Sequence, residues 1–144
     1  LTGFDPINTN LIKNEIKRLN SEGATVIFST HRMESVEEIC TDIGLINNGT
    51  VMVEGPLLEI RKRYKDGTYS FTTTVPFEFE QTTFVSQGNI HTGYQTVLKL
   101  DVYPKDLVID LAQKGQLIAF EEVLPKVSDI FIDIVQNGPK HNTL

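Results

Sequence analysis

The chain has 144 residues, of which 40% are hydrophobic, enough for one average domain or two small ones with an apolar core. Its 13 basic and 19 acidic side chains give a formal net charge of -6, which argues against binding to a nucleic-acid backbone. The single cysteine, Cys40, excludes an internal disulfide and fits a reducing compartment. No run approaches the roughly 20 apolar residues that span a bilayer. We therefore expect a soluble, cytoplasmic protein without a signal peptide.

The first residues of the chain predict a helix followed by a strand. Asp5 and Pro6 form a helix start, because aspartate caps free backbone N–H groups and proline is tolerated in the first turn. Apolar residues recur at helical spacing as far as Leu19, and Gly23 ends the pattern. Residues 24–30 are then apolar in consecutive positions, which predicts a strand covered on both faces, as in a parallel sheet.

A second helix and a hairpin are expected after His31. Apolar residues between Met33 and Ile43 fall on one helical face. Two short strand patterns, residues 42–46 and 50–55, flank a strong tight-turn signal at residues 47–49. Pro56 opens another short helix, which ends in a basic cluster more typical of a solvated helix end than of a partner site.

The dipeptide Asp66-Gly67 is the predicted boundary between two domains. Beyond it, strand patterns occupy residues 68–75, 94–103 and 116–123, and helical patterns occupy residues 104–114 and 126–135. These elements predict a small α+β sandwich with helices on one face of a sheet. The expected domains are residues 1–65, residues 66–138 and a flexible tail of residues 139–144.

Three motifs in a fixed order give the chain its family resemblance. LTGFDP at residues 1–6 resembles the D-loop of ATP-binding-cassette (ABC) ATPases, and VIFSTH at residues 26–31 resembles the strand and switch histidine of that family. DIGLINNGTVMVEG at residues 42–55 is the third motif and follows in the family's order. In addition to these three, VLPKVSDIFIDIV at residues 123–135 is similar to the end of the accessory domain of export-type cassette proteins. The resemblance implies an α/β fragment, the carboxyl-terminal part of a P-loop NTPase core, followed by the α+β sandwich.

The resemblance also implies site residues. His31 matches the catalytic switch histidine, which senses the terminal phosphate of ATP, and its place at the carboxyl end of a predicted strand agrees with that role. Thr2, Gly3 and Asp5 match nucleotide-site residues of the D-loop, where the aspartate acts across a head-to-tail dimer. Without these motifs, Asp5 would be read as a helix cap and His31 as a surface histidine. No metal ligand is expected among them.

The remaining motifs of a P-loop ATPase are missing from the sequence. It contains no Gly-x-x-x-x-Gly-Lys-Ser/Thr loop and no Ser-Gly-Gly-Gln signature, and no Asp-Glu pair precedes LTGFDP. We therefore expect a carboxyl-terminal fragment that alone neither binds ATP tightly nor hydrolyses it, with ATP and Mg²⁺ used by the intact subunit. Because the strand at residues 24–30 would lack neighbours, the fragment is also expected to self-associate, to swap elements or to leave its first third loosely ordered.

The function implied is a share in ATP-driven export. The expected partners are a second ATPase subunit and membrane-spanning permease subunits, which would hold the protein at the inner face of the cell membrane; nucleic acid is not expected. Two alternatives stay open. The second domain could be a small-molecule-binding regulatory module, by fold analogy alone, or the whole chain could be a dimerisation module without ATPase activity.

Overall fold

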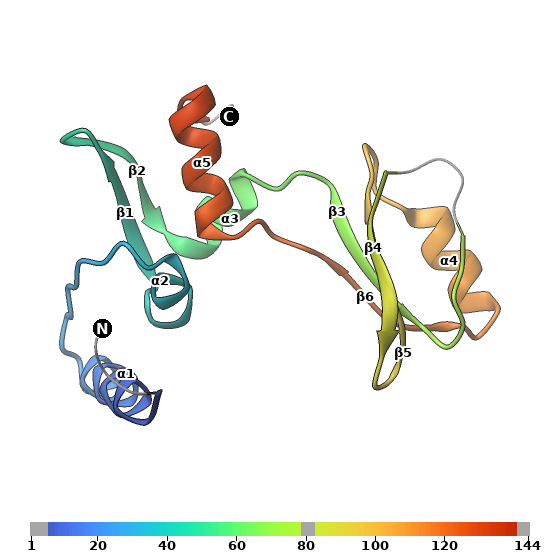
Figure 1. Ribbon diagram of the computed structural model, residues 1–144, viewed down its shortest axis with the longest axis horizontal. Helices are drawn as coiled ribbons and strands as arrows, with labels where there is room; N and C mark the ends of the chain where they lie inside the picture. The colour runs from blue at the N-terminus through green and yellow to red at the C-terminus, as the bar shows by residue number, and fades with distance from the viewer. Residues whose placement is uncertain (1–5, 79–82, 141–144) are drawn as a thin grey trace. The chain divides into compact units, whose positions relative to one another are not determined.

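The computed structural model describes residues 6–78 and 83–140, which belong to two compact units. The first unit comprises Leu1–Ile60 and Lys126–Leu144, and the second comprises Arg61–Pro125. The first contains α1 (Pro6–Ser21), α2 (Met33–Ile39), β1 (Asp42–Asn47), β2 (Thr50–Pro56), the start of α3 (Leu57–Arg63) and α5 (Val127–Asn137) (Figure 1). The second contains β3 (Thr68–Thr73), β4 (Thr83–Ile90), β5 (Gly93–Lys99), α4 (Lys105–Gln113) and β6 (Leu117–Glu122).

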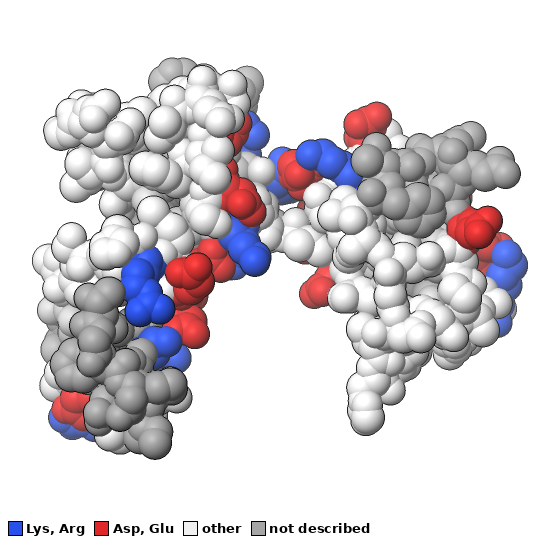
Figure 2. All heavy atoms as spheres, in the orientation of Figure 1, with Lys and Arg blue, Asp and Glu red and all other residues white. Residues whose placement is uncertain are grey.

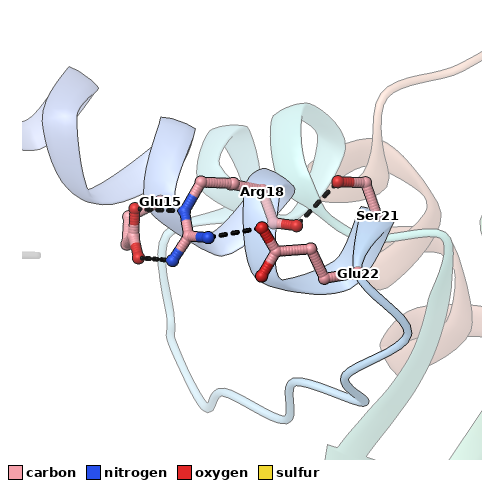
Figure 3. A network of polar contacts seen from close by, with 4 residues as sticks. All are labelled: Glu15, Arg18, Ser21 and Glu22. Carbon is pink, nitrogen blue, oxygen red and sulfur yellow. Dashed lines mark hydrogen bonds and ion pairs between the residues drawn. The ribbon is translucent and has the colours of Figure 1, made fainter.

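Helix α1 confirms the predicted first helix and its end. The N–H of Ala24 donates to the carbonyl of Leu19 and the N–H of Gly23 to that of Asn20, both at 3.0 Å, which is the hydrogen-bond pair of a Schellman motif. On its last turns, the Arg18 guanidinium donates to the carboxylates of Glu15 and Glu22 (Figure 3). Hydrogen bonding to Arg18 lowers the pKa of Glu15.

Residues 24–32 form no strand, so the prediction of a strand at residues 24–30 is wrong for this chain. They run irregularly between α1 and α2, and the Ile27 side chain is 91% exposed (Figure 1). A strand of the parallel-sheet type needs neighbours that take its backbone hydrogen bonds and cover both faces. None of the described strands pairs with this segment, and both sheets of the described residues are antiparallel. The P-loop NTPase core therefore stays a prediction.

The predicted hairpin at residues 42–55 is confirmed. Strands β1 and β2 pair antiparallel across a two-residue turn in which Asn48 (φ 49°) and Gly49 (φ 73°) both have positive φ, as a type I′ turn requires. Leu45 lies opposite Val53, and both are buried. The hairpin thus supplies apolar side chains to the core of the first unit.

Helix α5 belongs to the first unit, although we expected it to pack on the sheet of the second. It contacts α2, and it buries Val127, Ile130 and Ile134 along one helical face. Ile130 and Ile134 are buried, whereas Phe131 is half-buried. The prediction that this helix packs on the sheet of the second unit is therefore wrong, because residues from Lys126 onward belong to the first unit.

The second unit is an antiparallel sheet of order β4-β5-β3-β6 with one helix. Its core joins Tyr69, Phe71 and Leu98 of the sheet to Leu107 and Leu111 of α4. The predicted combination of a sheet with a helix is thus found for α4 but not for α5, and β4 adds a strand where the sequence pattern indicated no definite element. The assignment of residues 1–65 and 66–138 to separate domains stays a prediction.

Arg61 joins the two ends of the second unit. Its Nε donates to the carbonyl of Pro125 at 2.9 Å and its Nη2 to that of Leu124 at 3.0 Å. The fixed fork of the guanidinium suits two neighbouring carbonyl oxygens. The segment entering this unit and the segment leaving it are therefore tied side by side.

Asp66 and Gly67 fasten the start of β3 to the end of β5. The Asp66 carboxylate accepts hydrogen bonds from the Thr68 hydroxyl at 2.7 Å and from Lys99 Nζ at 2.7 Å. Gly67 has φ 77°, and its carbonyl accepts the N–H of Leu100 at 2.8 Å. A Cβ atom on Gly67 would lie 2.1 Å from the Leu100 carbonyl oxygen, so the backbone approach requires glycine.

Replacing Gly67 tests this approach. Gly67→Ala should lower the free energy of unfolding by on the order of 3 kcal/mol, because it combines left-handed backbone strain with a backbone clash. The matched control is Gly115→Ala, at φ 65° with no atom within 4 Å of the new Cβ, which should cost only about 1 kcal/mol. Urea unfolding followed by circular dichroism measures both. Equal losses would show that the contact with Leu100 is not tight.

The Asp66 carboxylate makes stability depend on pH. Partial burial works to raise the pKa of Asp66, but the hydrogen bonds from Lys99 and Thr68 outweigh it and the pKa is lowered. A lowered folded-state pKa gives stabilisation that is present above the unfolded value of about 3.9 and is lost as the pH falls through the folded value. Asp66→Asn should therefore be less stable than the parent chain at pH 7, and this difference should shrink below about pH 4.

Urea unfolding at several pH values measures this difference. Asp101→Asn, which removes an exposed carboxylate close to Lys99 in the chain, controls for the change in net charge. A stability difference between Asp66→Asn and the parent chain that stayed constant down to pH 2 would contradict the assignment.

Candidate functional site

His31 is the predicted site residue that the structure describes. It lies at the end of the irregular segment, two residues before α2, and it is exposed. The Thr30 hydroxyl accepts the N–H of Arg32 at 3.0 Å, and the Arg32 carbonyl accepts the N–H of Ser35 at 3.2 Å. These bonds form a short turn that leads the chain from the histidine into the helix.

Helix α2, which follows the histidine, is held from two sides. The Glu38 carboxylate pairs with Lys13 of α1, and hydrogen bonding to Lys13 lowers the pKa of Glu38. On the other side, Glu37 Oε1 accepts the N–H of Val127, the first residue of α5, at 2.5 Å. Ser35, between them and His31 in sequence, is buried. Elements from both ends of the chain therefore support the helix next to His31.

Several charged side chains of the described surface form local ion pairs. On the face drawn in Figure 2, basic and acidic side chains lie in small mixed groups. Ion pairs such as Lys99 with Asp66 and Lys114 with Asp110 agree with this distribution. Pairs of this kind at a surface each contribute little to stability, so the folded state depends mainly on its apolar cores.

The other predicted site residues belong to the D-loop at the start of the chain. Thr2, Gly3 and Asp5 lie outside the described residues, which begin at Pro6. Their approach to a nucleotide, and any proximity to His31, stays a prediction. A lone imidazole can exchange a hydrogen bond with a ligand, but phosphoryl transfer needs further groups.

Three other features of the described residues bear on the chemistry of the chain. Burial raises the pKa of the half-buried Cys40 thiol, which disfavours a reactive thiolate. Within residues 6–78 and 83–140, no group of three or more His, Cys, Asp and Glu side chains is placed to hold a metal ion. No described helix has the length and apolarity needed to cross a membrane.

Sequence reasoning missed Glu37. Its partner Val127 lies 90 residues away, and a backbone N–H leaves no trace in residue identity. The only local signal is the presence of a helix start shortly after Pro125, which must find partners for its free N–H groups. That signal does not say which side chain will supply them.

The family of the chain follows from its second half. Residues 55–135 match the family model "ATP-binding protein DrrA1-3-like, C-terminal domain". This range is more than half of the 144 residues. The chain therefore belongs to this family of ABC-type ATP-binding proteins.

Individual relatives agree with this assignment. An ABC transporter ATP-binding protein of Alkalihalophilus pseudofirmus is 31% identical over 140 residues, covering 93% of this chain and 51% of that protein. The ABC transporter ATP-binding protein YhaQ of Bacillus subtilis is also 31% identical over 140 residues, and the match covers 93% of this chain and 46% of the length of YhaQ. The linearmycin resistance ATP-binding protein LnrL of Bacillus subtilis is 39% identical over 61 residues, and the match covers 42% of this chain and 20% of the length of LnrL.

The resemblance inferred from the three motifs is thus confirmed at the level of the family. The chain spans about half the length of the first two of these relatives. Their alignments cover 93% of the chain and so include the segment around His31, which the family model does not reach.

Hydrogen exchange tests the exposed segment next to the site. The amides of residues 25–30 should exchange at close to intrinsic rates, because none of them donates a backbone hydrogen bond to another described residue and most of their side chains are exposed. The amides of α5 in the same unit should be protected and serve as the internal control. Strong protection across residues 25–30 would mean that the segment pairs with another strand in solution.

Proposed function

We propose that this chain is the carboxyl-terminal part of an ABC transporter ATPase subunit in which ATP hydrolysis drives export through separate membrane subunits. The observation that carries the proposal is an exposed histidine at the entrance to α2 in a chain of the DrrA1-3-like family. The order of the three sequence motifs supports the same role. The LnrL relative, named for linearmycin resistance, agrees with a role in export.

His31 is the proposed contact to the terminal phosphate of ATP. An imidazole can donate a hydrogen bond to a phosphate oxygen on which charge develops during transfer. Thr2, Gly3 and Asp5 are proposed to act at the nucleotide site of a head-to-tail dimer. Because the sequence has no phosphate-cradling loop, ATP and Mg²⁺ would be held mainly by residues outside this chain, and the chain alone is proposed to be inactive.

The apolar segment between α1 and α2 is the proposed junction with the rest of the ATPase. The Ile27 side chain is 91% exposed, and relatives twice as long contain sequence that could cover it. Pairing there would place His31 at the end of a strand, where ligands of α/β sheets bind. In the isolated chain, the same exposed side chains would favour self-association.

A second ATPase subunit and membrane-spanning permease subunits are the proposed partners, and they would locate the subunit at the inner face of the membrane. The exported substrate is then chosen by the permease. The chain itself would contribute the histidine and the carboxyl-terminal domain.

Substitution of His31 tests the proposal. In a protein that joins this chain to an upstream P-loop half, His31→Ala should lower the kcat for ATP hydrolysis by roughly 10²–10³-fold, the effect of removing one hydrogen-bond donor to a charged transition state. ATP binding should change little. Phosphate release and equilibrium nucleotide binding measure the two effects.

His91→Ala is the matched control, because His91 is exposed in the turn between β4 and β5 and has no proposed role. It should leave hydrolysis unchanged. Hydrolysis by His31→Ala at the parental rate would refute the catalytic role of this residue. Magnesium-dependent phosphate release by the isolated 144-residue chain would refute the proposal that the chain alone is inactive.

A further inference from the structure

Helix α5 begins without a cap of its own. Lys126 occupies the N-cap position in extended conformation and makes no side-chain hydrogen bond to the helix. The first N–H groups of a helix have no partner within it. The N–H of Val127 donates instead to Glu37 Oε1, at 2.5 Å, from a helix 90 residues earlier in the sequence.

The setting makes this hydrogen bond a strong one. The Val127 side chain is fully buried, and Glu37 is half-buried, so water competes weakly for the bond. A carboxylate at a helix N-terminus is further favoured by the helix dipole and by charge-assisted hydrogen bonding. Both residues belong to the first unit, and α2 contacts α5 there.

Helix α2 depends on such contacts. It has seven residues, too few to be stable on their own in water. Its N-cap residue Arg32 makes no side-chain capping bond. Its described tertiary polar contacts include Glu38 with Lys13 of α1 and Glu37 with Val127 of α5, and the second of these lies deeper in the unit. Loss of the Glu37 bond should therefore loosen the helix and the histidine that precedes it.

We propose that Glu37 is a positioning residue for His31. Its carboxylate ties α2 to the N-terminus of α5, so that the carboxyl-terminal helix fixes the segment in which the histidine stands. The relevance to hydrolysis rests on the proposed function. The link between Glu37 and His31 does not rest on the proposed function, because it concerns only how rigidly the chain around His31 is held.

NMR on the full 144-residue chain tests the link. Glu37→Ala should accelerate amide exchange at Val127 by about tenfold or more, the loss expected for one charge-assisted hydrogen bond. It should also increase fast motion of the His31 backbone and ring in relaxation measurements. Glu37→Gln keeps an oxygen acceptor and should restore most of both properties. Glu34→Ala, an exposed position of the same helix, is the matched control and should change neither.

Two NMR results would overturn the proposal. Unchanged exchange at Val127 in Glu37→Ala would mean that the bond does not form in solution. Faster exchange at Val127 with unaltered His31 motion would reduce Glu37 to a local helix cap. If Glu37→Ala does not fold, Glu37→Asp replaces it, because aspartate keeps the charge but is one methylene shorter and so withdraws the acceptor. The motion of His31 in Glu37→Asp then decides the proposal in the same way.

The corresponding test of hydrolysis separates this proposal from the proposed function. In the ATPase that joins this chain to a P-loop half, Glu37→Ala should lower kcat with little change in KM, and Glu37→Gln should recover it. If His31→Ala hydrolyses ATP normally, the catalytic role of the histidine fails while the NMR result still decides the link. If His31→Ala is inactive but Glu37→Ala is fully active, the link does not position the histidine for hydrolysis, and the positioning proposal fails.

Discussion

The first unit is held together by the burial of one face of α5. Val127, Ile130 and Ile134 are each no more than 1% exposed, and burying a side chain of this size contributes roughly 1.5–3 kcal/mol. The other elements of the unit are individually weak, because an isolated two-stranded hairpin and a seven-residue helix are both marginal in water. Helix α2 thus depends on contacts with a helix from the far end of the chain. In the positioning proposal, these contacts also act on His31.

Local signals made part of this fold predictable from sequence. The helix ending before Gly23 and the turn at Asn48 and Gly49 are encoded by neighbouring residues, and the structure confirms them. The apolar run at residues 24–30 was misleading, because a strand covered on both faces needs neighbouring strands that the described residues do not supply. The periodicity of α5 gave its existence but not its partner, since an apolar face does not identify the surface that covers it.

The candidate site was predictable to a different extent. The order of motifs pointed to His31 and to the family, and the family is confirmed by a match over residues 55–135. Thr2, Gly3 and Asp5 lie outside the described residues, so their geometry adds nothing to the prediction. Glu37 could not have been found from spacing, because its bond is to a backbone N–H 90 residues away.

The clamp formed by Arg61 on Leu124 and Pro125 has an evolutionary consequence. Residues 61–125 form the second unit, and the hydrogen bonds of Arg61 hold the first and last residues of this segment together. A segment whose two ends are held together can change in length, or be replaced, between homologues without displacing the residues that flank it. Domain insertion is tolerated at sites of the same kind. Selection can then reshape this module independently of the histidine and its supporting helices.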